Sequence, residues 1–244
     1  MKIAILGYGK MGKLIERIAI NDGHIIVAKY SKSLGTVLEA PEELQNADIC
    51  IDVSHSCCIL DHVLACAKMQ KNIVIGTTNW EREKDLVHDI VQKYQIGCFY
   101  SPNFSIGFNL FKCIIAHAAQ LMNAFDHYDV FGLEHHHRQK VDSPSGTART
   151  LVDTLISHLD RKTQAQYDRL NREIQPQEIH YASVRSGSNP GTHTICFDSP
   201  IDSITLTHQS HNREGFARGA IQIAQWMQDK KGFLTMEDFL NLIY

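Results

Sequence analysis

The sequence predicts an α/β protein that joins a domain built on a parallel sheet to a second, α+β domain with an open mixed sheet. Three observations predict this fold class. Short apolar runs alternate with helical patterns over the first hundred residues, a glycine-rich turn follows the first run, and longer strand-like runs replace the alternation after residue 105. Regular alternation of strands and helices is typical of parallel sheets that helices cover on both faces.

Each element of the first domain is predicted by the spacing of its apolar residues. Compact apolar runs indicate strands, and apolar residues three and four positions apart indicate helices. In the segment 81–94, for example, Val87, Ile90 and Val91 fall on one helical face. The predicted strands are 2–6, 24–30, 47–53, 72–75 and 96–100, and the predicted helices are 11–20, 55–69 and 81–94.

The pattern changes after residue 105. Turn-rich joints such as 186–191 separate the later strands, which favours an open sheet in which most neighbouring strands run antiparallel. We therefore place one domain at 1–105 and 212–244 and the other at 106–211. The elements predicted here are helices at 110–122, 147–159 and 216–228 and strands at 128–133, 178–185, 192–197 and 201–208.

Composition narrows the class of protein. The chain has 24 basic and 27 acidic residues, and this formal net charge of −3 gives no field for a polyanion, so we expect no nucleic-acid partner. No apolar stretch reaches the ~20 residues of a membrane span, and the N-terminal apolar run is too short for a secretory signal. Seven cysteines without CxxC spacing indicate reduced thiols, so we expect a cytoplasmic protein without a membrane partner.

A glycine-rich segment follows the first predicted strand and opens the first predicted helix. In such a loop the first glycine permits a tight turn, the second lets the backbone approach a pyrophosphate, and the third lets the helix pack on the strand. The helix N-terminus then offers N–H groups to the phosphates. The sequence therefore predicts dinucleotide binding at Gly7, Tyr8, Gly9, Lys10, Met11 and Gly12.

Two further segments bear on this binding site. A carboxylate for the ribose hydroxyls is expected at the end of the second strand, but residues 29–32 contain two lysines and no acidic residue. A cationic rim there suits a 2′-phosphate, although solvated surface lysines are the alternative. Gly76, Thr77 and Thr78 follow the strand 72–75 at an edge where parallel sheets bind ligands, although a plain turn is equally compatible with these residues.

The segment 134–147 holds the densest group of reactive side chains, including three adjacent histidines. Zinc is one alternative, but adjacent side chains of an extended segment point to opposite faces, so at most two histidines could share a metal. Because no HExxH motif or distant Cys/His set accompanies them, we expect no metal. A solvated polar loop is the other alternative.

The end of this segment looks like the N-terminal cap of the helix 147–159. Serine and threonine hydroxyls and an exposed glycine backbone at a helix N-terminus make a socket for anions. Such a socket beside histidine and lysine predicts a carboxylate substrate, because imidazole and ammonium groups near one another can also transfer protons. The residues of this socket are Ser145, Gly146 and Thr147.

These motifs together resemble the dihydrodipicolinate reductase family, also called 4-hydroxy-tetrahydrodipicolinate reductases. The segment EHHHRQKVDSPSGTA at 134–148 is similar to the family signature E-x-HH-x-x-K-x-D-x-PSGTA. Five other segments resemble family motifs in the same order along the chain. They are the nucleotide loop at 7–12, a second cofactor contact at 76–78, a hinge at 101–110, a turn at 184–194 and a closing helix at 216–226.

The resemblance implies a homotetrameric oxidoreductase with a Rossmann-like nucleotide-binding domain and a domain for substrate binding and tetramerisation. It implies that NADPH or NADH reduces 4-hydroxy-tetrahydrodipicolinate, a small cyclic dicarboxylate, to tetrahydrodipicolinate with release of water. This step belongs to diaminopimelate and lysine biosynthesis.

The resemblance also implies roles for residues that match by position. His136 matches the acid/base histidine and Lys140 the proton donor, while His137 matches a substrate-binding histidine. Gly146 and Thr147 match the carboxylate-binding pair, which Ser145 precedes. The residues that match those touching the nicotinamide half are Gly76, Thr77, Thr78, Ser101, Pro102, Asn103 and Phe104.

The chain departs from the family pattern in three places. The nucleotide loop is one residue shorter than the commoner form, and the acidic residue after the second strand is missing; both leave the choice between NADH and NADPH open. His135 stands where the family often has alanine. Two other classes also stay open: a non-catalytic dinucleotide sensor, which would not need histidine, lysine and an anion socket together, and a zinc hydrolase, which metal analysis would reveal.

Overall fold

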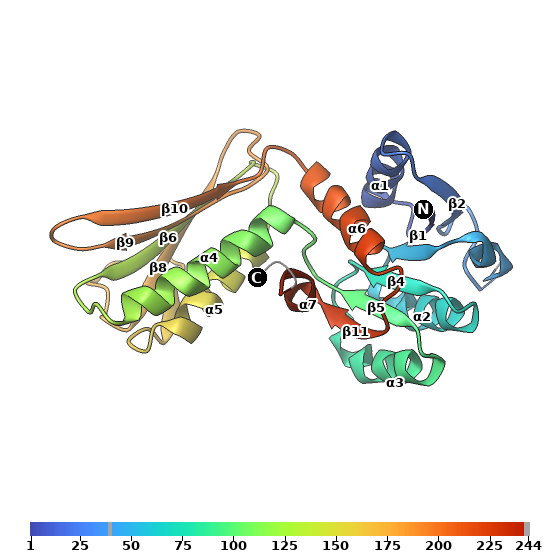
Figure 1. Ribbon diagram of the computed structural model, residues 1–244. Coiled ribbons are helices and arrows are strands. Elements are labelled where there is room, and N and C mark those ends of the chain that lie inside the picture. The colour runs from blue at the N-terminus through green and yellow to red at the C-terminus, as the bar shows by residue number, and fades with distance from the viewer. Residues whose placement is uncertain (39–40, 242–244) are drawn as a thin grey trace. The chain divides into compact units, whose positions relative to one another are not determined.

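The computed structural model describes residues 1–38 and 41–241, and the chain divides into two compact units (Figure 1). The N-terminal unit comprises Met1–Ile106 and Glu214–Tyr244, and the second unit comprises Gly107–Arg213. The chain therefore crosses between the units twice, after Ile106 and after Arg213. No helix among the described residues is long and apolar enough to span a membrane.

The N-terminal unit is built on a parallel sheet with strand order β11-β5-β4-β3-β1-β2. This sheet confirms the predicted fold class. Every residue of the central strands β3 and β4 is buried, including the polar Asp52 at the end of β3 and Asn72 at the start of β4. The strands are β1 (Lys2–Leu6), β2 (Ile25–Tyr30), β3 (Ile49–Asp52), β4 (Asn72–Ile75), β5 (Gly97–Tyr100) and β11 (Gly232–Thr235).

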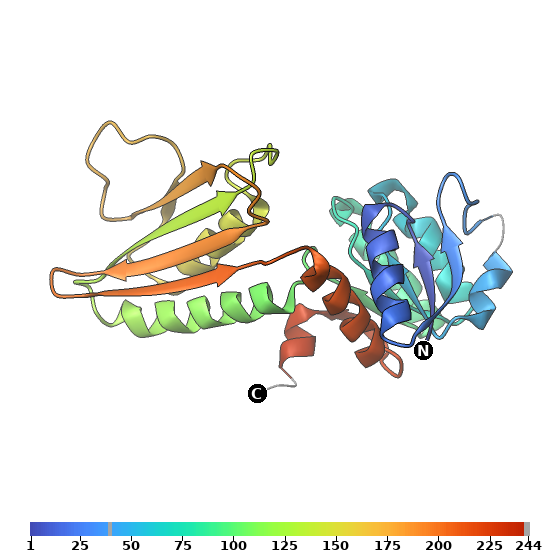
Figure 2. The same ribbon diagram turned by 90° about the horizontal axis from the view of Figure 1, so that it is seen from above.

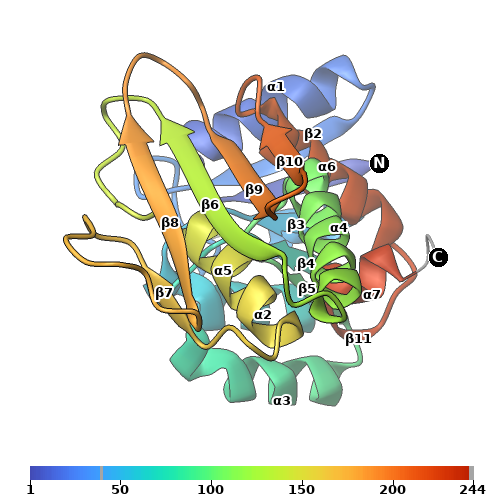
Figure 3. The same ribbon diagram turned by 90° about the vertical axis from the view of Figure 1, so that its left-hand side faces the viewer.

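Helices cover both faces of this sheet (Figures 1 and 3). The helices α1 (Lys10–Asn21) and α6 (Glu214–Trp226) pack together, and so do α2 (Ile59–Lys68) and α3 (Lys84–Tyr94). Alternate residues of β1 serve the two faces, and Ala4 and Leu6 join the core with α2 and α3. A short helix, α7 (Met236–Leu240), follows β11.

The second unit holds an open mixed sheet with strand order β10-β9-β6-β8-β7. Its strands are β6 (Asp129–His136), β7 (Gln164–Gln166), β8 (Glu178–Arg185), β9 (Thr192–Asp198) and β10 (Ser203–Gln209). The expectation that most neighbours are antiparallel is wrong: β9 runs antiparallel to β6 and β10, but β8 runs parallel to β6 and β7. Helix α5 (Gly146–His158) causes the difference, because the crossover that contains it brings the chain back to enter β8 in the direction of β6.

One face of this sheet is covered and the other is open (Figure 2). The helices α4 (Ile106–Asn123) and α5 pack on the covered face, where Phe111, Leu151 and Tyr181 belong to a buried apolar cluster. On the open face, Phe131, Leu133 and Val184 are 46%, 39% and 44% exposed. Burial alternates along β6, so every second residue faces outward. Because Phe131 and Leu133 are among these outward residues, the open face of the sheet is partly apolar.

Candidate functional site

The glycine-rich segment forms a tight loop against the end of β2. The N–H groups of Gly7 and Tyr8 both donate to the carbonyl oxygen of Tyr30, at 3.0 and 3.1 Å. Gly7 has a φ of +101°, and a Cβ there would lie 2.6 Å from the backbone of Ser54. A Cβ on Gly12 would lie 2.3 Å from the carbonyl oxygen of Gly7. Both positions therefore require glycine.

The middle glycine of the loop leaves room for a ligand. Gly9 is the N-cap of α1, makes no side-chain cap, and an ideal Cβ on it would meet no atom within 4 Å. The first N–H groups of a helix have no partner within the helix and attract anions. This open backbone at the start of α1 fits the pyrophosphate of a dinucleotide.

The other predicted cofactor residues gather at the carboxyl ends of β4 and β5. Met11, Gly76, Pro102 and Phe104 line one small pocket of the N-terminal unit, together with apolar residues of α1 and α6. A Cβ on Gly76 would lie 2.4 Å from the ring of Phe104, so this glycine lets the ring approach the strand end. The structure thus brings together loop residues that are far apart in the sequence.

A buried aspartate that the sequence analysis missed holds these loops in place. The carboxylate of Asp52, at the end of β3, accepts hydrogen bonds from the hydroxyls of Thr77 at 2.6 Å and Ser54 at 2.8 Å. His62 Nδ1 of α2 lies 2.5 Å from its other oxygen. The sequence signal was an acidic residue inside the apolar run 47–53, where nothing polar is expected without a partner.

In the second unit, adjacent residues of β6 serve opposite faces of the sheet. Glu134 and His136 are buried on the covered side, whereas His135 points the other way. His135 Nε2 lies 2.9 Å from the hydroxyl of Ser186, and Asn189 donates to its Nδ1 at 3.0 Å. The role of His135 is therefore to fix the turn that connects β8 to β9.

Glu134 has no solvent exposure and connects several parts of the site. Its carboxylate accepts hydrogen bonds from Ser183 at 2.8 Å, from Arg185 at 2.7 Å, and from both the N–H (3.0 Å) and the hydroxyl of Ser145. Burial alone would raise the pKa of this carboxyl, but these hydrogen bonds lower the pKa to about 2. Glu134 is therefore ionised at neutral pH and joins β6 and β8 to the start of α5.

His136 lies beside this carboxylate with its ring in a confined position. Its Nδ1 is 3.4 Å from Glu134 Oε2, and a Cβ on Gly191 would lie 2.9 Å from its Nε2. Burial is the main cause that lowers the pKa of His136, and Glu134 only partly opposes it. His136 is therefore neutral at pH 7. Burial likewise lowers the pKa of the neighbouring His193 to about 3.

Two buried ring nitrogens of the histidine segment make no hydrogen bond within the described part of the chain. Nδ1 of His137 has no partner there, and Nδ1 of His136 faces Glu134 Oε2 at 3.4 Å without forming a hydrogen bond. Buried polar atoms are nearly always hydrogen-bonded, so such atoms indicate a group that is not part of the chain.

Lys140 and the start of α5 complete the arrangement. Lys140 Nζ lies 2.8 and 2.9 Å from the carboxylate oxygens of Asp142, and Arg185 donates to the carbonyl oxygen of Asp142 at 2.7 Å. Ser145 is the N-cap of α5 and accepts from the N–H of Ala148 at 3.1 Å. An ideal Cβ on Gly146 would meet no atom within 4 Å, so the first turn of α5 has space for an anion.

The zinc alternative can be examined on the same residues. Glu134, His136 and His193 place their ligand atoms within 4.8 Å of one another, which makes them the candidate metal cluster among the described residues. The carboxylate of Glu134, however, already accepts hydrogen bonds from Ser145, Ser183 and Arg185. Because the carboxylate oxygens of Glu134 are already hydrogen-bonded, Glu134 is better suited to positioning its neighbours than to binding a metal.

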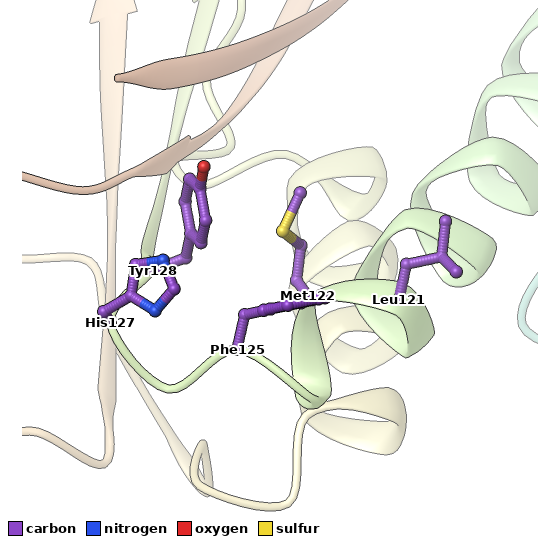
Figure 4. A pocket seen from close by; sticks show the side chains of 5 residues that line it. All are labelled: Leu121, Met122, Phe125, His127 and Tyr128. Carbon is purple, nitrogen blue, oxygen red and sulfur yellow. The ribbon is translucent and has the colours of Figure 1, made fainter. Parts of the chain in front are cut away.

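A second, apolar pocket lies at the C-terminal end of α4, in the second unit (Figure 4). It is lined by Leu121, Met122, Phe125, His127 and Tyr128. None of the predicted site residues lines it.

Comparisons with known proteins show which proteins this chain is similar to. The family model described as "Dihydrodipicolinate reductase, N-terminus" matches residues 1–104, and "Dihydrodipicolinate reductase, C-terminus" matches residues 107–240. The 4-hydroxy-tetrahydrodipicolinate reductase of Christiangramia forsetii is 36% identical over 244 residues, covering 100% of this chain and 99% of that protein. The 4-hydroxy-tetrahydrodipicolinate reductase of Laribacter hongkongensis is 37% identical, and the match covers 82% of this chain and 75% of that protein. Among solved structures, a dipicolinate-bound dihydrodipicolinate reductase from Paenisporosarcina sp. TG-14 has the same fold, with a TM-score of 0.77 and 23% identity over 98% of this chain and 99% of that one.

Proposed function

Because the chain belongs to the dihydrodipicolinate reductase family, it is an oxidoreductase that uses a nicotinamide cofactor, and we propose that the polar residues of its second unit hold the substrate and supply a proton. Its reaction is the reduction of 4-hydroxy-tetrahydrodipicolinate to tetrahydrodipicolinate with release of water, a step of diaminopimelate and lysine biosynthesis. The reductant is NADH or NADPH.

One observation carries the proposal for the second unit. The ring nitrogens of His136 and His137, which make no hydrogen bond within the described chain, are close in sequence to the backbone of Gly146 and Thr147, which forms the first turn of α5 directly after its N-cap Ser145. A cyclic dicarboxylate offers acceptors to both kinds of group, because its carboxylates accept from helix N–H groups and from imidazole N–H groups. We assign one carboxylate to Gly146 and Thr147 and the other side of the ring to His137. Ser145 supports this socket from behind, because its N–H and its hydroxyl both donate to Glu134.

The proton comes from Lys140 in this proposal. His136 is neutral at pH 7 because burial lowers its pKa, so it orients the substrate and relays a proton rather than donating one as a cation. Lys140 is a charged donor on a loop, and it must leave Asp142 to reach the ring. An exposed ion pair of this kind stabilises by only about 0–1 kcal/mol, so the exchange is easy.

The N-terminal unit fits a nicotinamide dinucleotide. The open backbone at Gly9 and the uncapped start of α1 match a pyrophosphate, and the small pocket by Gly76 and Phe104 lies at the strand ends. When bound, the cofactor supplies the hydride. The residues that we propose to hold it are Gly7, Tyr8, Gly9, Lys10, Met11, Gly12, Gly76, Thr77, Thr78, Ser101, Pro102, Asn103 and Phe104.

Turnover by the purified chain tests the function. Nicotinamide absorbance should fall when freshly generated 4-hydroxy-tetrahydrodipicolinate is added, and it should stay constant when either reactant is omitted. Binding of the dinucleotide without turnover would favour the sensor alternative instead. A hydrolytic activity that a chelator abolishes and zinc restores would favour the zinc hydrolase alternative.

Substitution of Gly146 tests the carboxylate socket. Since a Cβ at this position meets no atom within 4 Å, Gly146→Val should fold normally and block only the approach of the substrate. We expect KM to rise at least about tenfold, because the substrate loses one charge-assisted hydrogen bond worth about 1.5–3 kcal/mol. The Kd for the nucleotide should stay unchanged. An equal rise in both constants would show general damage to the protein.

We also propose that the chain works as a homotetramer in the cytoplasm. The free cysteines, among them the exposed Cys57, suit a reducing compartment.

The apolar open face with Phe131, Leu133 and Val184 is the surface best suited to contact other copies. Phe131→Lys should therefore shift the sedimentation coefficient toward that of smaller species, whereas Leu86→Lys, an exposed apolar site in the other unit, should not. Unchanged sedimentation of the Phe131 variant would contradict the assignment of this face.

A further inference from the structure

We propose that Glu16 selects against the 2′-phosphate of the dinucleotide by occupying Lys29 and by placing its own carboxylate beside the adenosine ribose. This inference rests on the proposed function, because it concerns the cofactor of that reaction.

Three side chains at the glycine loop form one connected group. The hydroxyl of Tyr8 donates a hydrogen bond to Glu16, and Lys29 Nζ lies 3.0 Å from Glu16 Oε1. Lys29 Nζ also lies 4.8 Å from the centroid of the Tyr8 ring, within the range of a cation–π contact. The side chains of Glu16 and Lys29 are 20% and 39% exposed, so the group is accessible to a ligand.

The backbone places this group where the adenosine ribose is expected. The N–H groups of Gly7 and Tyr8 both bond to Tyr30, the last residue of β2, so the loop and the strand end are adjacent. In folds with this glycine loop, a carboxylate at the end of the second strand bonds the ribose hydroxyls. That strand end has no carboxylate here, but Glu16 of α1 reaches Lys29, the last residue but one of β2. Glu16 thus supplies from the helix the carboxylate that the strand lacks.

The charge arrangement then opposes a 2′-phosphate. The hydrogen bond from Tyr8 is the main cause that lowers the pKa of Glu16, and Lys29 lowers it further, so the carboxylate is ionised at neutral pH. A phosphate beside it would face a like charge, and Lys29 is already engaged by Glu16. In this proposal Lys29 does not meet a 2′-phosphate, as the sequence alone suggested, because Glu16 holds it in an ion pair.

Direct binding measurements on single variants test the proposal. Calorimetric titration gives the Kd of NADH and of NADPH for the wild-type chain and for Glu16→Gln, which keeps the shape of the side chain and removes its charge. We expect wild type to bind NADH more tightly, and Glu16→Gln to shift the ratio of the two Kd values toward NADPH by about tenfold or more, as for one gained charge-assisted hydrogen bond. Adding Lys29→Ala to Glu16→Gln should abolish this gain.

A matched control separates the local effect from the change in net charge. Glu237 lies in α7, which follows β11 at the opposite edge of the sheet from β2, and Glu237→Gln removes the same charge. This variant should keep the wild-type ratio. An unchanged ratio in Glu16→Gln, or an equal shift in Glu237→Gln, would overturn the proposal while leaving the proposed function intact. Failure of the wild-type chain to bind either nucleotide would overturn both.

Discussion

Lys140→Ala should lower kcat by about 10²–10⁴-fold, the usual contribution of general acid catalysis, while the Kd of the nucleotide stays unchanged. The lysine is the charged donor of the site, because His136 is neutral and the guanidinium of Arg185 does not lose its protons. Stopped-flow or steady-state kinetics with saturating substrate measure the effect. Nucleotide titration shows that the N-terminal unit is intact, and urea unfolding of the same sample shows that the second unit is folded.

Two comparisons make this prediction specific. Arg138→Ala removes a neighbouring exposed cation, and it should keep kcat within about threefold of wild type, well short of the general-acid range. His136→Ala should lower kcat comparably to Lys140→Ala, and the double variant should lose far less than the product of the two effects if the residues act as one unit. A Lys140→Ala variant that keeps kcat within about threefold would show that this lysine transfers no proton.

Glu134→Gln should destabilise the protein by about 3–5 kcal/mol, because it leaves the charge of Arg185 partly buried without its partner. Urea unfolding measures this free energy. Among the described residues Glu134 is also the carboxylate that connects Ser145 to β6 and β8, so kcat/KM of the folded fraction should fall as well. Glu173→Gln, an exposed glutamate of the same unit, is the control and should be nearly neutral.

The pH dependence of stability follows from the same group. The folded-state pKa of Glu134 is about 2, below its ordinary value of 4.5, so its contribution is fully present above pH 4.5 and is lost as the pH falls toward 2. The Glu134→Gln variant should lose less stability than wild type over this range. Identical acid unfolding of the two proteins would contradict the role given to this carboxylate.

Apolar periodicity predicted most of the fold, because long periodic segments leave few alternatives. The strands β7 (QAQ) and β11 (GFLT) were missed because their sequences lack the compact apolar run that marks the equally short β4. The direction of β8 was also missed, since the pattern of a strand does not record which way its neighbour runs. That direction follows from the crossover through α5, which only the folded chain reveals.

The candidate residues of the second unit could be proposed from the sequence because they are contiguous. His136, Lys140 and Ser145 lie in one short segment. The sequence alone indicates a helix cap beside basic groups there. The partners of Glu134 come from β8, some fifty residues on, and depend on the strand register, which opposes Glu134 to Ser183. The pairing of Glu16 with Lys29 depends in the same way on how α1 packs beside β2.

Isotope tracing tests the central claim most directly. The purified chain would be given NADPH or NADH that carries deuterium at the transferable position of the nicotinamide, together with freshly generated 4-hydroxy-tetrahydrodipicolinate, and the product would be analysed by mass spectrometry. We predict tetrahydrodipicolinate with one deuterium on a ring carbon, formed in equal amount to the oxidised nicotinamide, and almost none with Lys140→Ala. Product without deuterium, or oxidised nicotinamide without product, would contradict the account.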